Sequence, residues 1–163
     1  MRIMKLKGRG GFTLIEALIS VALLGIFTMG IGVGVSAAAQ TMGSSVTVSE
    51  AGLLSDTLVK AIRGELRYAR DIVSGGGTAV YTSQRYGTTA TIVDNPNTEG
   101  NARIYVASDA GYFDLLSEGA YTNLQANVSV TYNEAQSTFE VELRIILPGG
   151  QIRTTNFKVY TLL

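Results

Sequence analysis

Residues 12–39 read FTLIEALISVALLGIFTMGIGVGVSAAA, a run of 28 residues in which Glu16 is the only ionisable side chain. About 20 helical residues cross the roughly 30 Å hydrocarbon core of a bilayer, so this run is long enough to span a membrane as one helix. A basic cluster precedes the run and no comparable cluster follows it, which predicts a cytoplasmic N-terminus and an extracytoplasmic remainder. The cluster consists of Arg2, Lys5, Lys7 and Arg9.

Glu16 is unusual because it lies inside this apolar run. An ionised carboxylate within a lone membrane helix costs about 2.5–3.5 kcal/mol, and such residues usually have a partner or a function. Two interpretations remain open from the residue alone. Glu16 lies near the cytoplasmic interface, where its charge costs little, or it serves a pairing role.

An ordinary secretory signal is the main alternative to a retained membrane helix. The small residues 36–39 before Gln40 are of the kind that signal peptidase accepts after an apolar run. However, the run is much longer than the usual apolar region of about 7–15 residues, and it contains a carboxylate near its start. We therefore expect the helix to be retained.

Residues 8–18, GRGGFTLIEAL, resemble the class III signal of type IV prepilins and pseudopilins. In that family a short basic leader ends in glycine, and the mature chain begins with phenylalanine and has a glutamate at its fifth position. The resemblance implies that a prepilin peptidase cuts after Gly11 and methylates the new amine of Phe12. It also implies that Glu16 recruits the subunit by pairing with the Phe12 ammonium of a neighbouring subunit, in a low-dielectric setting where pairing offsets much of the desolvation.

The resemblance further implies a structural subunit of a type IV pilus or a related filament. Its partners would be the prepilin peptidase, other pilin subunits, the membrane and an assembly platform. A surface pilus, a secretion pseudopilus and a DNA-uptake filament remain open. Whether the subunit is a major or a minor pilin also remains open, since Val33 stands where many major pilins have proline.

Glycines replace that proline in the second half of the apolar run. Glycine costs a helix interior about 1 kcal/mol relative to alanine, so several glycines would loosen the helix during assembly. Gly30 and Gly34 also form a G-x-x-x-G pair, a common device for close helix packing in membranes. A loosened helix and close helix packing both stay open as interpretations, because both follow from the missing side chain of glycine and do not exclude each other.

The remaining chain predicts an α+β domain. Apolar residues recur at three- and four-residue spacing from Leu54 to Val73, including Leu58 and Leu66, which predicts an amphipathic helix that ends at Ser74–Gly77. Strand-like segments follow, and together they predict an antiparallel meander packed on that helix. The expected strands are 79–84, 88–93, 103–107, 127–132, 138–147 and 151–161.

These patterns divide the chain into four parts. Residues 1–11 form a cytoplasmic leader and residues 12–39 a transmembrane and assembly helix. Residues 40–77 form a polar transition and the amphipathic helix, and residues 78–163 form the antiparallel sheet part of the globular domain. This is also the plan of pilins, a long helix packed on a sheet.

Composition argues against an enzyme. The chain has no histidine and no cysteine, which removes the commonest general base and the usual nucleophile pairs. Without residues 1–11, nine basic face thirteen acidic side chains, so the body is mildly acidic and we predict no nucleic-acid partner. We expect no cofactor and no metal. The stretches 94–99 and 109–118 are rich in oxygen ligands that could hold calcium, but neither has EF-hand spacing.

Two other function classes remain as alternatives to a filament subunit. One is a binding domain tethered by a single helix, which predicts that Glu16 is dispensable. The other is a secreted binding domain, which predicts a mature N-terminus at Gln40.

Overall fold

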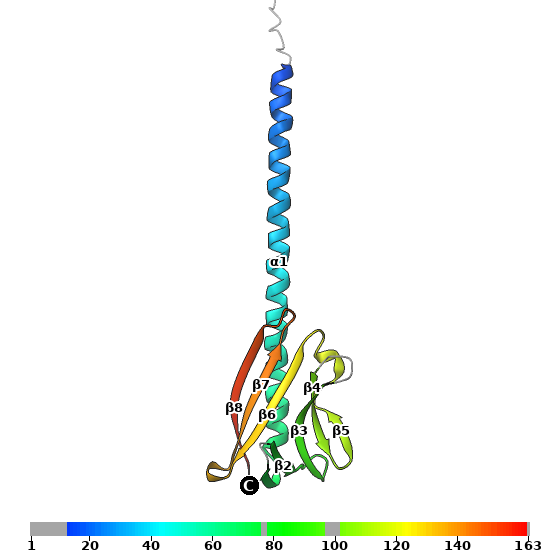
Figure 1. The fold of residues 1–163 in the computed structure, drawn as a ribbon, viewed down its shortest axis with the longest axis vertical. Helices are drawn as coiled ribbons and strands as arrows, with labels where there is room; N and C mark the ends of the chain where they lie inside the picture. Colours follow the sequence, from blue (N-terminus) through cyan, green and yellow to red (C-terminus); the bar gives the residue numbers. More distant parts are fainter. Residues whose placement is uncertain (1–12, 76–77, 97–101, 163) are drawn as a thin grey trace, which may run out of the picture. The chain divides into compact units, whose positions relative to one another are not determined.

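The computed structural model describes residues 13–75, 78–96 and 102–162. Within them, one long helix is followed by antiparallel strands, which confirms the predicted α+β class (Figure 1). The helix is α1 (Leu14–Leu66), and two short 3-10 helices, η1 (Glu118–Ala120) and η2 (Glu134–Gln136), interrupt the strands. The strands are β1 (Arg70–Gly75), β2 (Thr78–Thr82), β3 (Thr89–Pro96), β4 (Ala102–Ser108), β5 (Gly111–Asp114), β6 (Gln125–Asn133), β7 (Thr138–Ile146) and β8 (Ile152–Tyr160).

The chain divides into two compact units, residues 1–45 and residues 46–163. The described part of the first unit is helical from Leu14 onward, and each of its described side chains is exposed. The polar residues after Gln40 do not end the helix, because α1 continues to Leu66.

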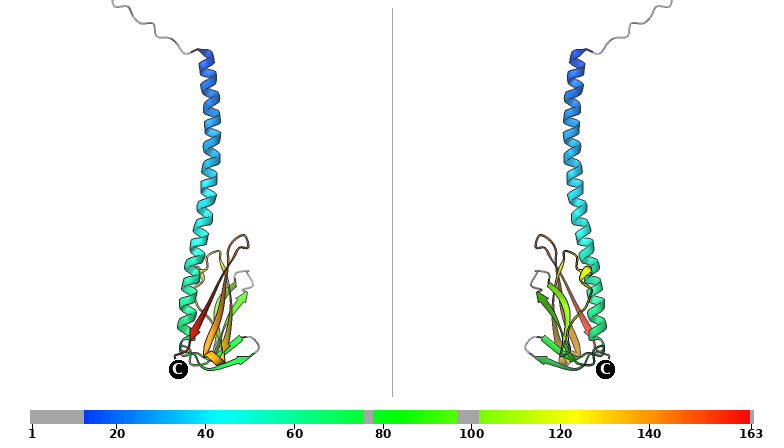
Figure 2. Two further views of the ribbon diagram at one scale, coloured as in Figure 1. Left: turned by 90° about the vertical axis from the view of Figure 1, so that its left-hand side faces the viewer. Right: turned by 90° about the vertical axis from the view of Figure 1, so that its right-hand side faces the viewer.

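The second unit contains the last part of α1 and two antiparallel sheets. The strand order is β1-β2-β3-β4-β5 in one sheet and β6-β7-β8 in the other. Figure 2 shows these strands from two further sides. We predicted one meander, and the structure divides it between these two sheets. The β6-β7-β8 sheet has a regular register over its whole length, from Asn133 opposite Thr138 to Ile146 opposite Ile152.

The core of the second unit forms where one face of α1 meets the inward faces of the strands. Leu58, Ile62 and Leu66 have no exposed surface, which confirms the predicted burial of Leu58 and Leu66. Alternate residues of β7, such as Phe139 and Leu143, are equally buried. The period of two in β7 therefore meets the helical stripe of α1, as the sequence pattern requires.

The end of α1 corrects one prediction. We expected the helix to run to Val73 and to end at the glycines after Ser74, but it ends at Leu66 and residues 70–75 form β1. Val73 pairs with Val80 and is 62% exposed, so it is not part of the helical stripe. The β-branched pair Ile72 and Val73 favours a strand, and β2 provides the strand's hydrogen-bond partner.

Hydrogen bonds at this helix end explain why α1 can stop at Leu66 and be followed by a strand. The last carbonyl groups of a helix have no partner within it. Here the backbone N–H of Leu162 donates to the carbonyl of Arg67 at 2.9 Å, and that of Ala69 donates to Leu66 at 3.2 Å. Sequence periodicity alone cannot reveal a partner from the far end of the chain.

The remaining strand predictions agree with the structure to within a few residues. The expected segments correspond to β2, β3, β4, β6, β7 and β8. The four-residue strand β5 was not predicted. The chain turns between β2 and β3, and Gly87 in this turn takes the positive φ of 68° that favours glycine.

Candidate processing and assembly site

Thr13 and Glu16 form a reciprocal cap at the start of α1. The backbone N–H of Thr13 donates to Glu16 Oε2 at 3.0 Å, and the backbone N–H of Glu16 donates to Thr13 Oγ1 at 3.3 Å. The Thr13 hydroxyl also donates to Glu16 Oε2, at 2.9 Å. This is a capping box, in which the first and fourth residues satisfy each other's free N–H groups.

The sequence signal for this cap was present but was not used in our prediction. A threonine followed three residues later by a glutamate, before an apolar run, is typical of a helix start. The resemblance to prepilins implies a role for the charge of Glu16. The structure adds a second role, because Glu16 also fixes where α1 begins.

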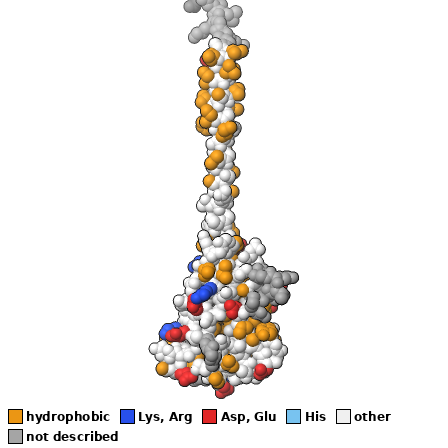
Figure 3. Space-filling view, viewed as in Figure 1, with side chains coloured by type: hydrophobic (Ala, Val, Ile, Leu, Met, Phe, Trp, Pro, Cys, Tyr) orange, Lys and Arg blue, Asp and Glu red, His pale blue; other side chains and the backbone are white. Residues whose placement is uncertain are grey.

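The apolar part of α1 is suited to a lipid environment. It contains a segment with mean hydropathy 2.3 and no buried side chains, long and apolar enough to cross a membrane. Apolar side chains cover its first half and thin out toward the polar residues after Gln40 (Figure 3). A single-pass membrane anchor fits this helix.

Hydroxyl groups in this segment are satisfied by the helix itself. The hydroxyl of Ser20 donates to the carbonyl of Glu16 at 2.7 Å, and that of Thr28 to the carbonyl of Gly25 at 2.9 Å. Ser36 and Thr41 donate in the same way to Val33 and Ala37. Because lipid offers no hydrogen-bond partner, these local bonds lower the cost of polar side chains in the bilayer.

The glycines of the apolar run lie on an uninterrupted helix. Apart from the neighbouring residues and backbone of α1 itself, no described atom lies within 4 Å of the place a Cβ would take at Gly25, Gly30, Gly32 or Gly34. The G-x-x-x-G surface at Gly30 and Gly34 is therefore open within the described chain. A second helix can approach closely there.

The other predicted site residues lie outside the described residues. These are the cleavage pair Gly11 and Phe12 and the leader charges Arg2, Lys5, Lys7 and Arg9. Their predicted roles stay predictions.

The second unit contains a part-buried carboxylate that sequence reasoning missed. Glu65 Oε1 accepts a hydrogen bond from the hydroxyl of Ser83 at 2.5 Å and from that of Tyr81 at 3.4 Å. Burial, together with the nearby Glu65 carboxylate, raises the pKa of Tyr81 well above its usual range. Ser83 also accepts from the backbone N–H of Tyr86 at 3.3 Å, so Glu65 stabilises the turn before β3.

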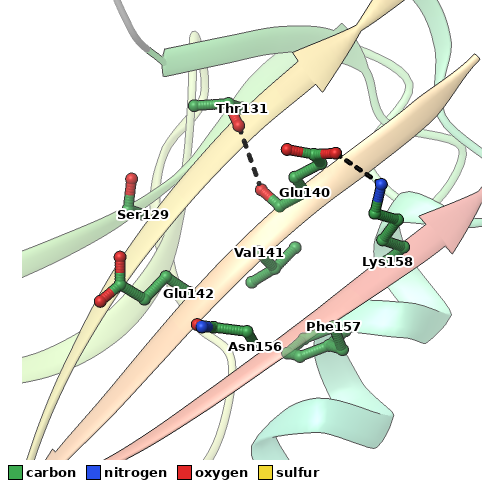
Figure 4. Close-up of a pocket in the computed structure, with 8 residues that line it drawn as sticks. All are labelled: Ser129, Thr131, Glu140, Val141, Glu142, Asn156, Phe157 and Lys158. Carbon is green, nitrogen blue, oxygen red and sulfur yellow. Dashed lines mark hydrogen bonds and ion pairs between the residues drawn. The ribbon is translucent and has the colours of Figure 1, made fainter. Parts of the chain in front are cut away.

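The outer face of the β6-β7-β8 sheet is polar and slightly hollowed (Figure 4). Lys158 Nζ lies 2.7 Å from Glu140 Oε1, and the Thr131 hydroxyl donates to the Glu140 carbonyl at 3.4 Å. The hydrogen bond with Glu140 raises the pKa of Lys158. These contacts cross neighbouring strands, as expected for cross-strand pairs on a solvated sheet face.

The two stretches considered for calcium do not form a cluster in the part that the structure describes. Among those residues, no group of three or more Asp, Glu, His or Cys side chains lies close enough to hold a metal ion. Glu118 instead pairs with Arg103 at 3.6 Å. Asn97 and Glu99 lie outside the described residues.

A comparison with family models identifies the N-terminal segment. The model of the prokaryotic N-terminal methylation motif matches residues 6–32, which include Gly11, Phe12 and Glu16. Comparisons with curated proteins and with solved structures gave no match. The chain thus carries the class III signal of type IV pilins at the head of a long apolar helix, as a pilin-like prepilin or pseudopilin does.

Proposed function

We propose that this chain is a prepilin that is stored in the cytoplasmic membrane and polymerises through its N-terminal helix. A prepilin peptidase cuts after Gly11 and methylates the amine of Phe12. The leader lies in the cytoplasm and the globular domain outside, before the subunit enters a pilus or a related filament. The observation that carries this proposal is the methylation motif at residues 6–32, placed directly before and across the start of α1.

The position of the helix start supports cleavage at this bond. The described helix begins at Leu14, so the Gly11–Phe12 bond precedes it in the sequence. Glycine lacks a Cβ and allows close approach of a protease's catalytic groups. After the cut, the new ammonium would be one residue away from Thr13, the helix cap.

Glu16 has two separable contributions in this proposal. As a cap, it accepts a hydrogen bond from the Thr13 N–H at 3.0 Å. As a charge, it attracts the Phe12 ammonium of a neighbouring subunit where the dielectric is low. The capping role operates within one chain, whereas the charge role operates between subunits.

Mass spectrometry of the mature N-terminus tests the processing step. Coexpression with a prepilin peptidase should yield a chain that begins with N-methylated Phe12. Gly11→Leu should block the cut and leave membrane insertion intact, because insertion depends on the hydrophobicity of the helix. A mature chain that begins at Gln40 would show that an ordinary signal peptidase acts instead.

Three variants test the assembly step, each as the sole copy of the subunit in a host with the assembly machinery. Glu16→Gln keeps an oxygen that can accept from Thr13 and loses the charge, so processed subunits should accumulate in the membrane without entering filaments. Thr13→Ala loses the capping hydroxyl and keeps the charge, so filaments should persist. Glu16→Ala loses both and should resemble Glu16→Gln. Sheared-filament yield beside total membrane protein is the readout, and normal filament yield from Glu16→Gln would overturn the charge role.

A further inference from the structure

The sheets of the second unit differ in how their edges are protected. An open sheet edge has unpaired backbone groups that can pair with another strand, and most proteins blunt such edges. The register of β1 is irregular between Arg70 and Val73, β5 has four residues, and β6 lies against β3 and β4. Irregularity, short length and cover are three common ways to protect an edge.

Strand β8 is neither irregular nor short, and its contacts with α1 are made by side chains. It has nine residues, pairs with β7 in an unbroken register and contains no proline. Within residues 13–75, 78–96 and 102–162, no backbone group of β8 has a hydrogen bond beyond its ladder with β7. Figure 1 shows β8 as the outermost strand of its sheet.

The two cations of β8 are also turned away from this edge. Charged side chains, lysine above all, normally discourage pairing at an edge. Here the Lys158 ammonium is bound to Glu140 on β7 at 2.7 Å. The Arg153 guanidinium lies beside Gly52 of α1, with Nη1 3.3 Å from the place a Cβ would take.

The side chains of β8 are compatible with pairing to a second, antiparallel copy of β8. Ile152 and Tyr160, at the two ends of β8, are 60% and 68% exposed. If two copies of β8 pair in antiparallel register over their full length, Asn156 lies opposite itself and Ile152 lies opposite Tyr160. Thr154 then lies opposite Lys158, so no like charges face each other. A parallel, in-register pair would instead place Lys158 opposite Lys158, which is destabilising.

We propose that β8 pairs with β8 of a second copy of this chain in antiparallel register, with Asn156 on the two-fold axis. The contact joins two three-stranded sheets edge to edge. It is isologous, because the same surface serves both copies. It requires neither cleavage after Gly11 nor filament assembly.

The direction of β8 determines how the two copies meet. From its start to its end, β8 follows α1 in the same direction: Arg153 lies beside Gly52, the Thr155 hydroxyl is 3.1 Å from that of Ser55, and the Arg63 guanidinium lies over the Phe157 ring. A two-fold axis across β8 therefore sets residues 52–63 of the two copies antiparallel. The two chains enter the contact from opposite ends, which suits copies presented by two facing filaments or cells.

Single-cysteine variants test the pairing, because the natural chain has no cysteine. Directly opposed residues in antiparallel strands have Cα atoms about 4.5–5.5 Å apart, which a disulfide can bridge. Full-length Asn156→Cys in mild detergent should therefore give about tenfold more disulfide-linked dimer than Thr154→Cys. Thr154→Cys is a matched control on the same edge, because its two copies would be about 13 Å apart along the strands.

A mixed experiment tests the register. Thr154→Cys and Lys158→Cys chains with different tags should form a disulfide with each other and little with themselves. Equal crosslinking of Asn156→Cys and Thr154→Cys would overturn the proposal, because it indicates random collision. Strong self-crosslinking at both Thr154 and Lys158 would show a parallel pair and would also overturn it.

A second mixture tests the facing arrangement. Two cell populations that display Asn156→Cys chains with different tags should form a dimer of the two tags after the populations are mixed. Dimers restricted to chains from one population would overturn this arrangement. A charge exchange gives an independent check: Ile152→Lys combined with Tyr160→Glu should restore the crosslinking at Asn156 that Ile152→Lys combined with Tyr160→Lys abolishes.

Discussion

The two parts of α1 show how one helix can depend on two different surroundings. Residues 14–45 have no buried side chain, although their segment has mean hydropathy 2.3. Residues 46–66 bury one stripe, which includes Leu58, Ile62 and Leu66, under the strands. Helices gain most of their stability in proteins from what their apolar face contacts. The described side chains of the first part have no such contact within the chain, whereas the second part obtains it from the strands.

Truncation of a core leucine should give the largest difference between the two parts. Leu58→Ala should lower the free energy of unfolding of the second unit by about 2–5 kcal/mol, because it removes a fully buried side chain. Leu24→Ala, in the first part, is the matched control and should leave that free energy unchanged. Urea denaturation of the full chain in detergent, followed by circular dichroism, measures both. Equal losses from the two variants would show that the parts are not energetically separate.

The two glutamates of α1 should differ in the same way. Glu65→Ala should cost about 1–3 kcal/mol, because the buried Ser83 hydroxyl loses its acceptor. Glu65→Gln should cost less, since an acceptor oxygen remains. Glu16→Ala should not change the unfolding of the second unit, because its bonds with Thr13 lie in the first. The same denaturation curves provide the comparison, and a loss from Glu16→Ala that matches Glu65→Ala would contradict it.

Glycine replacements should have smaller and opposite effects. Gly64→Ala should stabilise the second unit by about 0.5–1 kcal/mol, because alanine is the better helix former and the site is open. Gly52→Ala should gain less, because the new Cβ would meet Arg153 Nη1 at 3.3 Å. Gly30→Ala should leave unfolding unchanged and weaken helix association instead. Thermal melts distinguish the first two, and self-association in detergent reports on the third.

The smallest expected effect is the pH dependence from Lys158. Its pKa is raised above the ordinary 10.5 by Glu140, so the folded state holds the proton more tightly than the unfolded state. The contribution is therefore complete below pH 10.5 and is lost as the pH rises through the folded pKa. Glu140→Gln should remove it, and salt should weaken it in the natural chain because the pair is exposed. Denaturation at pH 9 and 11.5, in low and high salt, tests this, and an unaltered pH dependence in Glu140→Gln would exclude the pair as its source.

Periodicity predicted those parts of the fold in which the spacing of apolar residues fits only one type of secondary structure. The alternation of Phe139, Val141 and Leu143 predicted β7, and the spacing of Leu58, Ile62 and Leu66 predicted the buried stripe of α1. The end of the helix was predicted wrongly, because Ile72 and Val73 fit a helical stripe as well as a strand. The pairing of Val73 with Val80 on β2 decides between helix and strand, and that pairing is a tertiary contact.

The site was predicted in a similar, uneven way. The methylation motif was recognised from residues 8–18, because leader, glycine, phenylalanine and glutamate stand at fixed spacing. The cap at Thr13 is also encoded locally, by a threonine three residues before a glutamate, although our prediction for Glu16 concerned only its charge. The carboxylate of Glu65 was beyond sequence reasoning, because Ser83 lies eighteen residues away and reaches it through the fold.

The contact between β8 and α1 also sets an order of events during synthesis. Ser55 and Thr155 are separated by 100 residues, and the Leu162 N–H closes on the Arg67 carbonyl only when the last residues are present. Contacts between such distant residues form late, because a long loop must close first. The anchor can therefore enter the membrane while the globular unit is still incomplete. A chain that stops before β8 would be inserted normally, but the buried stripe of α1 would be exposed to proteases. Membrane insertion therefore does not report whether the globular unit has folded.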